Sequence, residues 1–111
     1  FDRAVEFRTD DPDVWTNRGN LLVKLGRDEE AIASFDRAVE FRTDDPDVWT
    51  NRGNLLMKLR RDEEAISSFD RAIAFINDDP DIWTLRGNAL VNVGRYDEAI
   101  ESFDRAIEHQ A

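Results

Sequence analysis

The sequence predicts an all-α fold made of stacked helix pairs, and three observations support that class. The segment from Phe35 to Leu56, FDRAVEFRTDDPDVWTNRGNLL, repeats the segment from Phe1 to Leu22 letter for letter. A looser copy begins at Phe69 and the letters FDRAIE return at Phe103, so copies start at residues 1, 35, 69 and 103, a period of 34. Such a period is typical of an array in which each unit buries its apolar face against its neighbours. Within each copy, apolar residues recur at helical spacing, and no segment shows the alternation of a strand.

The first helix of each unit has a recognisable start, which is clearest at Asp45, Pro46 and Asp47. Aspartate favours the capping position, and proline favours the first helical position, where its missing N–H needs no partner. A carboxylate in the first turn also suits the positive end of the helix dipole. Trp49 and Gly53 then follow at helical spacing. The same start recurs at Asp11–Pro12–Asp13 and Asp79–Pro80–Asp81.

A second helix is predicted in each unit, with an apolar stripe spaced by three and four residues. Gly53 and Ala65 are small enough to let the two helices approach closely, with Trp49 and Phe69 filling the space around them. The short connection makes the two helices antiparallel. The stripe in the middle copy is Ala65, Ile66, Phe69, Ala72 and Ile73; the breaks fall at Gly26, Arg60 and Gly94; and the second helices begin near Asp28, Asp62 and Asp97. A leading helix at about 1–9 and pairs near 12–42, 46–76 and 80–109 make seven predicted helices.

Composition narrows the classes of partner. The 111 residues carry a formal net charge of -10, whereas nucleic acids are held by clustered Lys and Arg, so we expect no nucleic acid and a neutral or basic partner. No apolar run approaches the roughly 20 residues of a membrane span. There is no cysteine for a disulfide or a thiolate. We therefore expect no membrane contact and a cytoplasmic location, and because the chain begins inside a helical pattern we expect a fragment of a longer protein.

Neither catalysis nor metal binding is predicted. The single histidine, His109, has no serine or cysteine nucleophile arranged near it. The acidic clusters at 10–13, 44–47 and 78–81 lack the alternating spacing, glycine and trailing glutamate of a calcium loop, and helix capping explains them. We expect no enzyme activity, no cofactor and no bound metal.

The pattern resembles the tetratricopeptide repeat. The residues that carry the resemblance are Trp49-x2-Arg52-Gly53-x2-Leu56 and Ala65-x3-Phe69-x2-Ala72, together with the period of 34. The chain departs from the family where Arg18, Arg52 and Arg86 replace a usual leucine, and where Leu22, Leu56 and Leu90 replace tyrosines. The resemblance implies a right-handed superhelix over 1–111, with a partial repeat at 1–11 and full repeats at 12–45, 46–79 and 80–111.

The resemblance also implies a concave groove, lined mainly by the first helix of each pair, that binds an extended peptide or a partner's helix. A row of asparagines there offers donors and acceptors to a peptide backbone whatever its side chains, and resembles the asparagine ladder of O-GlcNAc transferase. The alternative is a solvated polar face copied by duplication, which needs no ligand. The predicted groove residues are Thr16, Asn17, Asn20, Lys24, Thr50, Asn51, Asn54, Lys58, Thr84, Asn88 and Asn92, with Asp13, Asp47, Asp81 and Leu85 beside them.

A second family site, the carboxylate clamp that captures acidic chaperone tails, is expected to be absent. Only Asn20 and Asn51 match it, Thr16 stands in place of a lysine, and the third repeat offers Asp81 and Leu85. The arginines at 18, 52 and 86 are expected to pack their stems on apolar surface and pair their guanidinium groups with nearby acids, rather than contact a ligand.

Two function classes remain open, with a third less favoured. The first is a scaffold or adaptor module that binds protein in the groove. The second is a structural array, natural or engineered, whose copies self-associate without a selected groove ligand. Apolar residues on the terminal helices, such as Ile100 and Ile107, support such homo-oligomers. RNA binding by a pentatricopeptide-like array is disfavoured by the period and the acidic charge.

Overall fold

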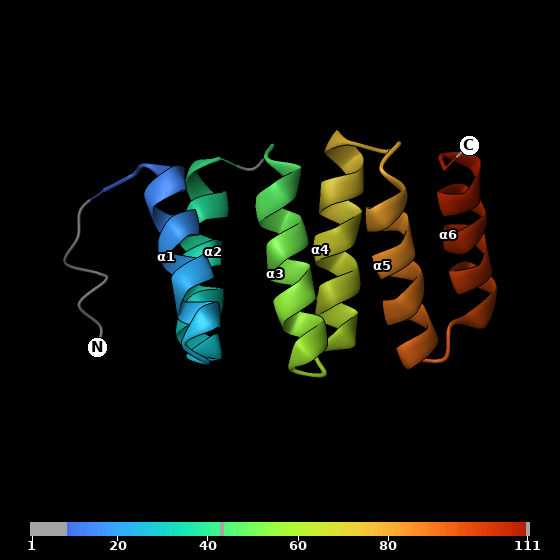
Figure 1. The fold of residues 1–111 in the computed structure, drawn as a ribbon, viewed down its shortest axis with the longest axis horizontal. Helices are drawn as coiled ribbons and strands as arrows, with labels where there is room; N and C mark the ends of the chain where they lie inside the picture. Colours follow the sequence, from blue (N-terminus) through green and yellow to red (C-terminus); the bar gives the residue numbers. More distant parts are fainter. Residues whose placement is uncertain (1–8, 43, 111) are drawn as a thin grey trace. The chain divides into compact units, whose positions relative to one another are not determined.

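The computed structural model describes residues 9–42 and 44–110, and these form six α-helices (Figure 1). The all-α prediction and the succession of helix–turn–helix pairs are confirmed. The predicted helix at about 1–9 lies outside the described residues. The helices are α1 (Pro12–Lys24), α2 (Asp28–Phe41), α3 (Pro46–Lys58), α4 (Asp62–Phe75), α5 (Pro80–Asn92) and α6 (Tyr96–Glu108).

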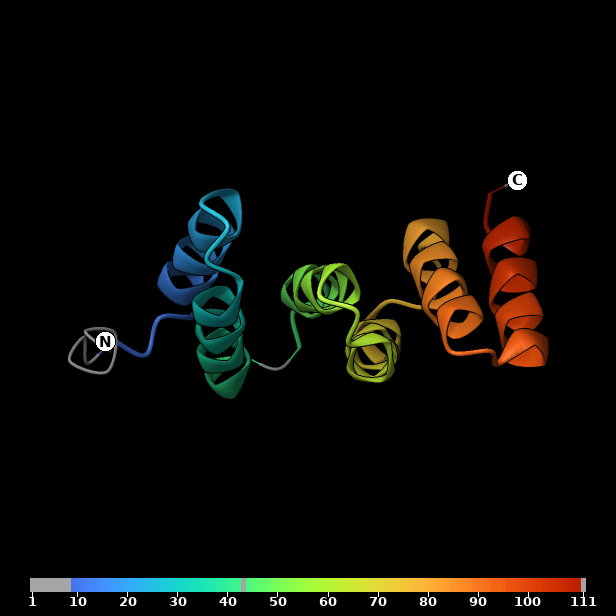
Figure 2. The ribbon, with the colours of Figure 1, turned by 90° about the horizontal axis from the view of Figure 1, so that it is seen from below.

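The chain divides into two compact units, Phe1–Thr43 and Asp44–Ala111. In the first unit α1 and α2 pack as a hairpin, which Figure 2 shows from below. Its core joins Trp15 of α1 to Phe35 of α2, which are 2% and 0% exposed. Gly19 permits this close packing, because a Cβ there would lie only 2.7 Å from a carbon of the Phe35 ring.

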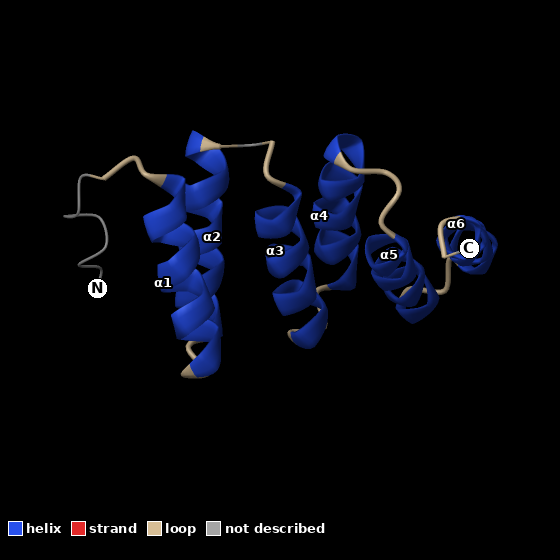
Figure 3. Cartoon of the chain, turned by 45° about the horizontal axis from the view of Figure 1, so that its top comes forward, coloured by secondary structure: helices blue, strands red, loops and turns tan. Residues whose placement is uncertain are grey.

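The second unit holds two hairpins, α3–α4 and α5–α6, which are joined where α4 packs against α5. Every element of the described residues in this unit is a helix or a loop (Figure 3). Leu56 and Phe69 fill the core of the first hairpin and Leu90 that of the second, all at 0% exposure. In both hairpins a glycine lies against an aromatic ring, since a Cβ at Gly53 or Gly87 would lie 2.6 Å from a ring carbon of Phe69 or Phe103, so the predicted close packing of a glycine against an aromatic residue is seen here too.

The predicted helix starts are confirmed in all three pairs. Proline is the first residue of α1, α3 and α5, and the side chain of the preceding aspartate accepts a hydrogen bond from the N–H two residues later, at 2.9 Å each time. The indole N–H of Trp15 donates to the carbonyl of Thr9 at 3.0 Å, and that of Trp83 to the carbonyl of Asn77 at 2.7 Å. Each tryptophan thus anchors the chain just before its own helix.

The breaks between paired helices also fall where predicted. Gly26 and Gly94 have φ of 74° and 81°, and Arg60 adopts the same left-handed conformation with φ of 64°. The last helix begins at Tyr96, one residue before Asp97, near which it was expected. The acid that marks the other two starts has shifted by one residue, but the N–H of Arg95 still bonds the carbonyl of Leu90 at 2.9 Å, so the backbone fixes the start.

Candidate functional site

The three predicted threonines lie on the first helix of each pair and are half-buried. Each hydroxyl donates to the carbonyl of the proline four residues earlier, at 2.8 Å: Thr16 to Pro12, Thr50 to Pro46 and Thr84 to Pro80. The hydroxyl proton is therefore already used within the helix. A ligand at these positions finds an acceptor oxygen and a methyl group, but no free hydroxyl donor.

The predicted asparagines differ in how available their carboxamides are. Asn17, Asn54 and Asn88 are exposed, and within residues 9–42 and 44–110 their carboxamides make no hydrogen bond. Asn20 is exposed and Asn51 is half-buried, and both interact with other groups of the protein. Asn54 and Asn88 occupy the same position on α3 and α5, which are in contact within the second unit. That unit therefore presents two unused carboxamides on adjacent helices.

The positions near the helix ends are partly engaged. The amide of Asn92 donates to a carboxylate oxygen of Asp62 at 3.1 Å, which ties α5 to α4. Lys24 and Lys58 are exposed on the last residues of α1 and α3. Asp13 lies 3.5 Å from the guanidinium of Arg42. Of the remaining neighbours, Asp47 and Asp81 are exposed and Leu85 is half-buried. The first unit thus brings together the predicted residues of α1, and the second unit those of α3 and α5.

The arginines at the usual leucine position hold the two helices of each hairpin together. Their Nη1 atoms donate to serine hydroxyls at 3.1, 2.6 and 2.5 Å, and in the first unit the Ser34 hydroxyl in turn donates a hydrogen bond to the carbonyl of Trp15 at 3.0 Å. The guanidinium carbons also lie 5.8–5.9 Å from the tryptophan ring centres of the same helix. The predicted pairing with an acid is seen at Arg86, whose Nε donates to Asp70 at 2.6 Å, whereas the bonds to buried serines were not predicted. The pairs are Arg18 with Ser34, Arg52 with Ser68 and Arg86 with Ser102.

The start of each second helix carries a bidentate ion pair between an arginine and a glutamate on the surface. Arg27 donates to both carboxylate oxygens of Glu30 at 2.7 and 2.8 Å, and Arg95 does the same to Glu98. The hydrogen bond from the guanidinium holds the pKa of Glu30 and of Glu98 below the ordinary value, and the carboxylate raises the pKa of Arg27 and Arg95. The arginines, which occupy the N-cap positions, make no side-chain hydrogen bond to the backbone of the first turn.

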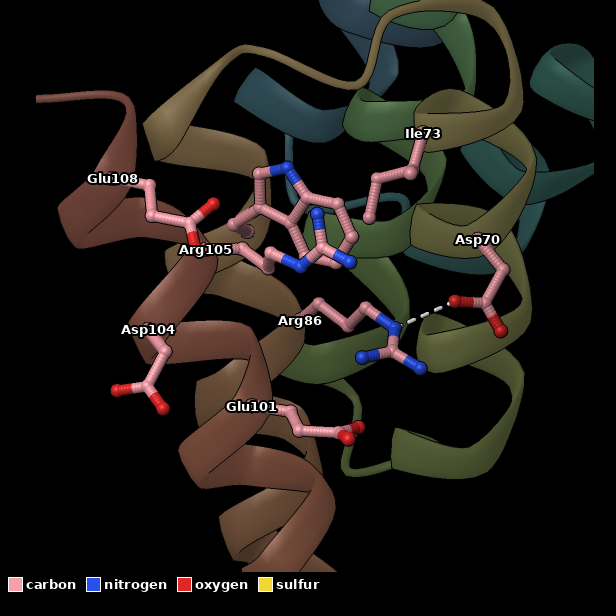
Figure 4. A pocket seen from close by; sticks show the side chains of 8 residues that line it. Asp70, Ile73, Arg86, Glu101, Asp104, Arg105 and Glu108 are labelled. Atoms are coloured by element: carbon pink, nitrogen blue, oxygen red, sulfur yellow. Dashed lines mark hydrogen bonds and ion pairs between the residues drawn. The ribbon is translucent and has the colours of Figure 1, made fainter.

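A pocket of about 400 Å³, which the sequence reasoning did not predict, opens on the second unit between α4, α5 and α6 (Figure 4). Arg86 points across it and donates from Nε to Asp70 at 2.6 Å, and the guanidinium carbon of Arg105 lies 5.8 Å from the centre of the Trp83 ring. Four carboxylates face two guanidinium groups, so the lining carries net negative charge. Its residues are Asp70, Ile73, Trp83, Arg86, Glu101, Asp104, Arg105 and Glu108. Three helices contribute to it, so only the fold brings these residues together.

Within residues 9–42 and 44–110, no group of three or more His, Cys, Asp or Glu side chains is arranged to hold a metal ion. None of the six helices has both the length and the apolar character needed to cross a membrane.

Comparison with solved structures shows the fold. MamA superposes with a TM-score of 0.89 at 21% identity, covering 96% of this chain, which spans 58% of that one. The first TPR domain of Spaghetti (RPAP3), solved with the HSP90 peptide SRMEEVD, gives 0.83 at 24% identity, covering 88% of this chain and 78% of that one. The second TPR domain, bound to the same peptide, gives 0.81 at 25%, covering 86% of this chain and 89% of that one. No curated protein matches the chain.

Family models account for most of the sequence. A TPR repeat model matches residues 19–60, and two tetratricopeptide repeat models match residues 46–79 and 80–110. The last two matches coincide with the α3–α4 and α5–α6 hairpins. With the period of 34 residues, the helix hairpins and these matches in agreement, the chain belongs to the tetratricopeptide repeat family.

Proposed function

We propose that this chain is a protein-interaction module that binds an extended peptide or a partner helix with the first helices of its pairs, α1 in the first unit and α3 and α5 in the second, and so acts as a scaffold or adaptor. The observation that carries the proposal is the set of exposed carboxamides of Asn17, Asn54 and Asn88, which the described part of the protein leaves without hydrogen bonds. A carboxamide both donates and accepts, so it suits a peptide backbone. The role needs no catalysis, and the single histidine, His109, is an exposed residue at the end of α6.

We further propose that the partner is neutral or basic, in contrast to the acidic SRMEEVD peptide of the two Spaghetti (RPAP3) domains. The chain carries a net charge of -10, and at the positions where the family's clamp would place cations it has Thr16, Asp81 and Leu85. Repulsion between like charges across an interface costs affinity and slows the encounter. Lys24 and Lys58 remain as two exposed cations, at the far ends of α1 and α3.

The test is binding to an array of immobilised synthetic peptides, in sets matched in length that carry positive, zero or negative net charge, with SRMEEVD among the acidic ones. The variant replaces Asn17, Asn54 and Asn88 by alanine together. We expect the parent to bind neutral and basic peptides, and the variant to lose that binding while its helical circular dichroism spectrum is unchanged. Each lost hydrogen bond contributes about 0.5–1.5 kcal/mol, so three together weaken binding by roughly 10-fold to 1,000-fold.

The matched control replaces Ser67, an exposed polar residue on α4, by alanine. It should bind like the parent. If the asparagine variant also binds like the parent, the row is a solvated face and the proposed site is wrong. Strong binding of SRMEEVD by the parent would instead refute the charge preference.

The second candidate function is a self-associating array. One observation favours it: Ile100 and Ile107 on α6 are 57% and 66% exposed, which is unusual for large aliphatic residues on a helix that packs on its other side. Light scattering over a concentration series tests it directly. A molar mass that stays at one chain at every concentration would exclude this candidate.

A further inference from the structure

The pocket between α4, α5 and α6 combines apolar surface with an arginine whose bonds are already made. Trp83 and Ile73, which are both half-buried, supply the apolar surface. The side chain of Arg86 is 18% exposed, and it donates from Nε to Asp70 and from Nη1 to Ser102. This guanidinium is therefore committed to holding the three helices together, and it does not serve as a binding site for an anion.

The α6 side of the pocket carries carboxylates that have no partner. Within the part of the chain that the structure describes, the carboxylates of Glu101, Asp104 and Glu108 make no hydrogen bond or ion pair. All three residues are exposed. In Figure 4 Glu101 extends from α6 toward Arg86, and Asp104 points away from α4. The pocket therefore offers charged acceptors to a ligand that carries N–H donors.

Arg105 shows which chemical group the indole of the pocket accepts. Its guanidinium carbon lies 5.8 Å from the centre of the Trp83 ring, and among the described residues it forms no ion pair. The equivalent contact of Arg71 with Trp49 is shorter, at 5.0 Å. Because Arg105 is exposed and is held only by this loose contact, a guanidinium from a ligand can take its place over the ring.

Two of the carboxylates distinguish this hairpin from its copies. Glu101 stands where the two earlier second helices have Ala33 and Ser67. Glu108 stands where α4 has Ala74. Since the same helix packs with alanine or serine at these positions, the packing of the repeat does not require a charge there. The two charges therefore call for an explanation outside the fold.

The accessibility of these two glutamates does not depend on α6 being the last helix. A hairpin packed on α6 as α5 packs on α4 would leave Glu101 and Glu108 open, because the equivalent residues of α4 are exposed beside α5. Asp104 differs, since its equivalent Asp70 is bonded by Arg86 of the next hairpin, and we leave it out of the site. The exposed residues of α4, which stand 34 positions before those of α6, are Ser67, Asp70, Arg71 and Ala74.

We propose that this pocket binds a segment of a partner protein that carries two arginine side chains. One guanidinium pairs with Glu101 and the other with Glu108, while the aliphatic stems lie on Trp83 and Ile73. The site contains none of the predicted groove residues, so the proposal goes beyond the proposed function and does not depend on it. Arginine suits the site better than lysine, because its planar group pairs with a carboxylate through two N–H groups and stacks on an indole.

The spacing of the two glutamates sets the spacing of the two arginines. Glu101 and Glu108 are seven residues apart on α6, which is about 10.5 Å along the helix axis. Residues three positions apart in an extended segment are separated by nearly the same distance, about 10 Å. The volume of about 400 Å³ lies in the lower part of the range of ligand sites, so it suits side chains better than a folded element.

The experiment follows the indole N–H signals of the ¹⁵N-labelled protein by NMR while a short peptide is added at physiological ionic strength. The peptides are acetylated and amidated, and in one fixed sequence they carry two arginines three positions apart, two glutamines or two glutamates. We expect only the arginine peptide to shift the signal of Trp83. The signals of Trp15 and Trp49 should not move, because neither residue lines the pocket.

The first variant replaces Glu101 and Glu108 by glutamine. It should bind the arginine peptide about 2-fold to 30-fold more weakly, which is the range expected for the loss of two exposed ion pairs. The matched control replaces Asp10 and Asp44 by asparagine, which makes the same change of charge at exposed residues outside the pocket. The control should bind like the parent. Circular dichroism of each variant checks that it is folded.

The second variant, Arg105→Gln, tests the sign of the charge that the pocket accepts. It removes a like charge and uncovers the ring of Trp83, so the arginine peptide should bind roughly 2-fold to 5-fold more tightly. A loss of affinity in this variant would contradict the proposal. The opposite directions expected for the two variants exclude a general effect of mutation at α6.

The remaining outcomes separate this site from the proposed groove. The proposal is wrong if the arginine peptide leaves the Trp83 signal unmoved, or if the glutamine variant binds like the parent. Replacing Asn17, Asn54 and Asn88 by alanine should leave the shift of Trp83 intact. If that variant loses the shift, the arginine peptide binds at the asparagines, and the pocket proposal fails while the proposed function stands.

Discussion

Replacing Gly53 by alanine should destabilise the protein, although the same change usually stabilises a helix. A Cβ at this position would lie 2.6 Å from the nearest carbon of the Phe69 ring, and ordinary contact begins at 3.4 Å, so the ring has to retreat by about 0.8 Å. Phe69 is 0% exposed, and its ring is enclosed by the core of the α3–α4 hairpin. The strain therefore cannot be relieved by a side chain that moves into solvent.

The magnitude follows from two opposing effects. Overpacking of a core costs about 1–3 kcal/mol, and exchanging glycine for alanine within a helix recovers about 1 kcal/mol. Because the added Cβ overlaps a fully buried ring, the overpacking cost lies in the upper part of this range, about 2–3 kcal/mol. We therefore expect a net loss of about 1–2 kcal/mol, measured as the free energy of unfolding in urea. A domain of roughly 100 residues loses about 4–8 °C of melting temperature for each kcal/mol.

A double-mutant cycle with Phe69→Leu tests the cause. If the clash is the reason, the double variant should be more stable than the sum of the two single losses by at least about 0.5 kcal/mol. Asn54→Ala is the matched control, because it adds alanine at the next residue of the same helix on an exposed site. It should change the stability by no more than about 0.5 kcal/mol. A Gly53→Ala variant as stable as the parent would falsify the packing described for this hairpin.

Three further outcomes are expected. Arg60→Gly should stabilise the chain by about 1 kcal/mol in urea unfolding, because Arg60 has a φ of 64° that glycine adopts without strain; a loss of stability would contradict this. Ser68→Ala should cost about 1 kcal/mol in the same assay, since the buried hydroxyl accepts from Arg52 at 2.6 Å, and a neutral result would show that this bond contributes little. Arg95 lowers the pKa of Glu98 below its unfolded value near 4.5, so the stability from this pair is complete above that pH and is lost as the pH falls through the folded-state pKa. The melting temperature of Glu98→Gln should therefore lie below that of the parent at neutral pH and equal that of the parent at acidic pH. A variant with the same melting temperature as the parent at both pH values would contradict this.

The sequence was sufficient for the parts of the fold that depend on local signals. The caps at Asp11, Asp45 and Asp79 and the prolines after them were predicted, because helix starts are set by residues close in the chain. The start of α6 was predicted near Asp97 and lies one residue earlier, because Tyr96 occupies the position of the acid that begins the other two second helices.

What the sequence could not supply were contacts between helices. Ser34, Ser68 and Ser102 look like ordinary helix-surface serines, yet they are 0–1% exposed and accept from the arginines of the paired helix. Each serine stands 16 positions after its arginine in the sequence, and this constant spacing was the one signal that would have revealed the pairs. At the candidate site, the contact of Asn92 with Asp62 was likewise invisible, because the two residues are 30 positions apart on different helices. The threonine bonds join each hydroxyl to the carbonyl four residues earlier in the same helix, a local contact that the predicted helices already allow.

The links inside each hairpin join residues that are close along the chain. The arginine–serine hydrogen bonds connect residues that are 16 positions apart along the chain in every hairpin. The glycine and the phenylalanine that pack together in each hairpin are also 16 positions apart. Loops of that length close at little entropic cost, and proteins dominated by such local contacts fold quickly. Any one of the three hairpins is therefore able to nucleate folding, and the others then add to it. Lengthening the array should raise its equilibrium stability while leaving the rate of the first folding step almost unchanged.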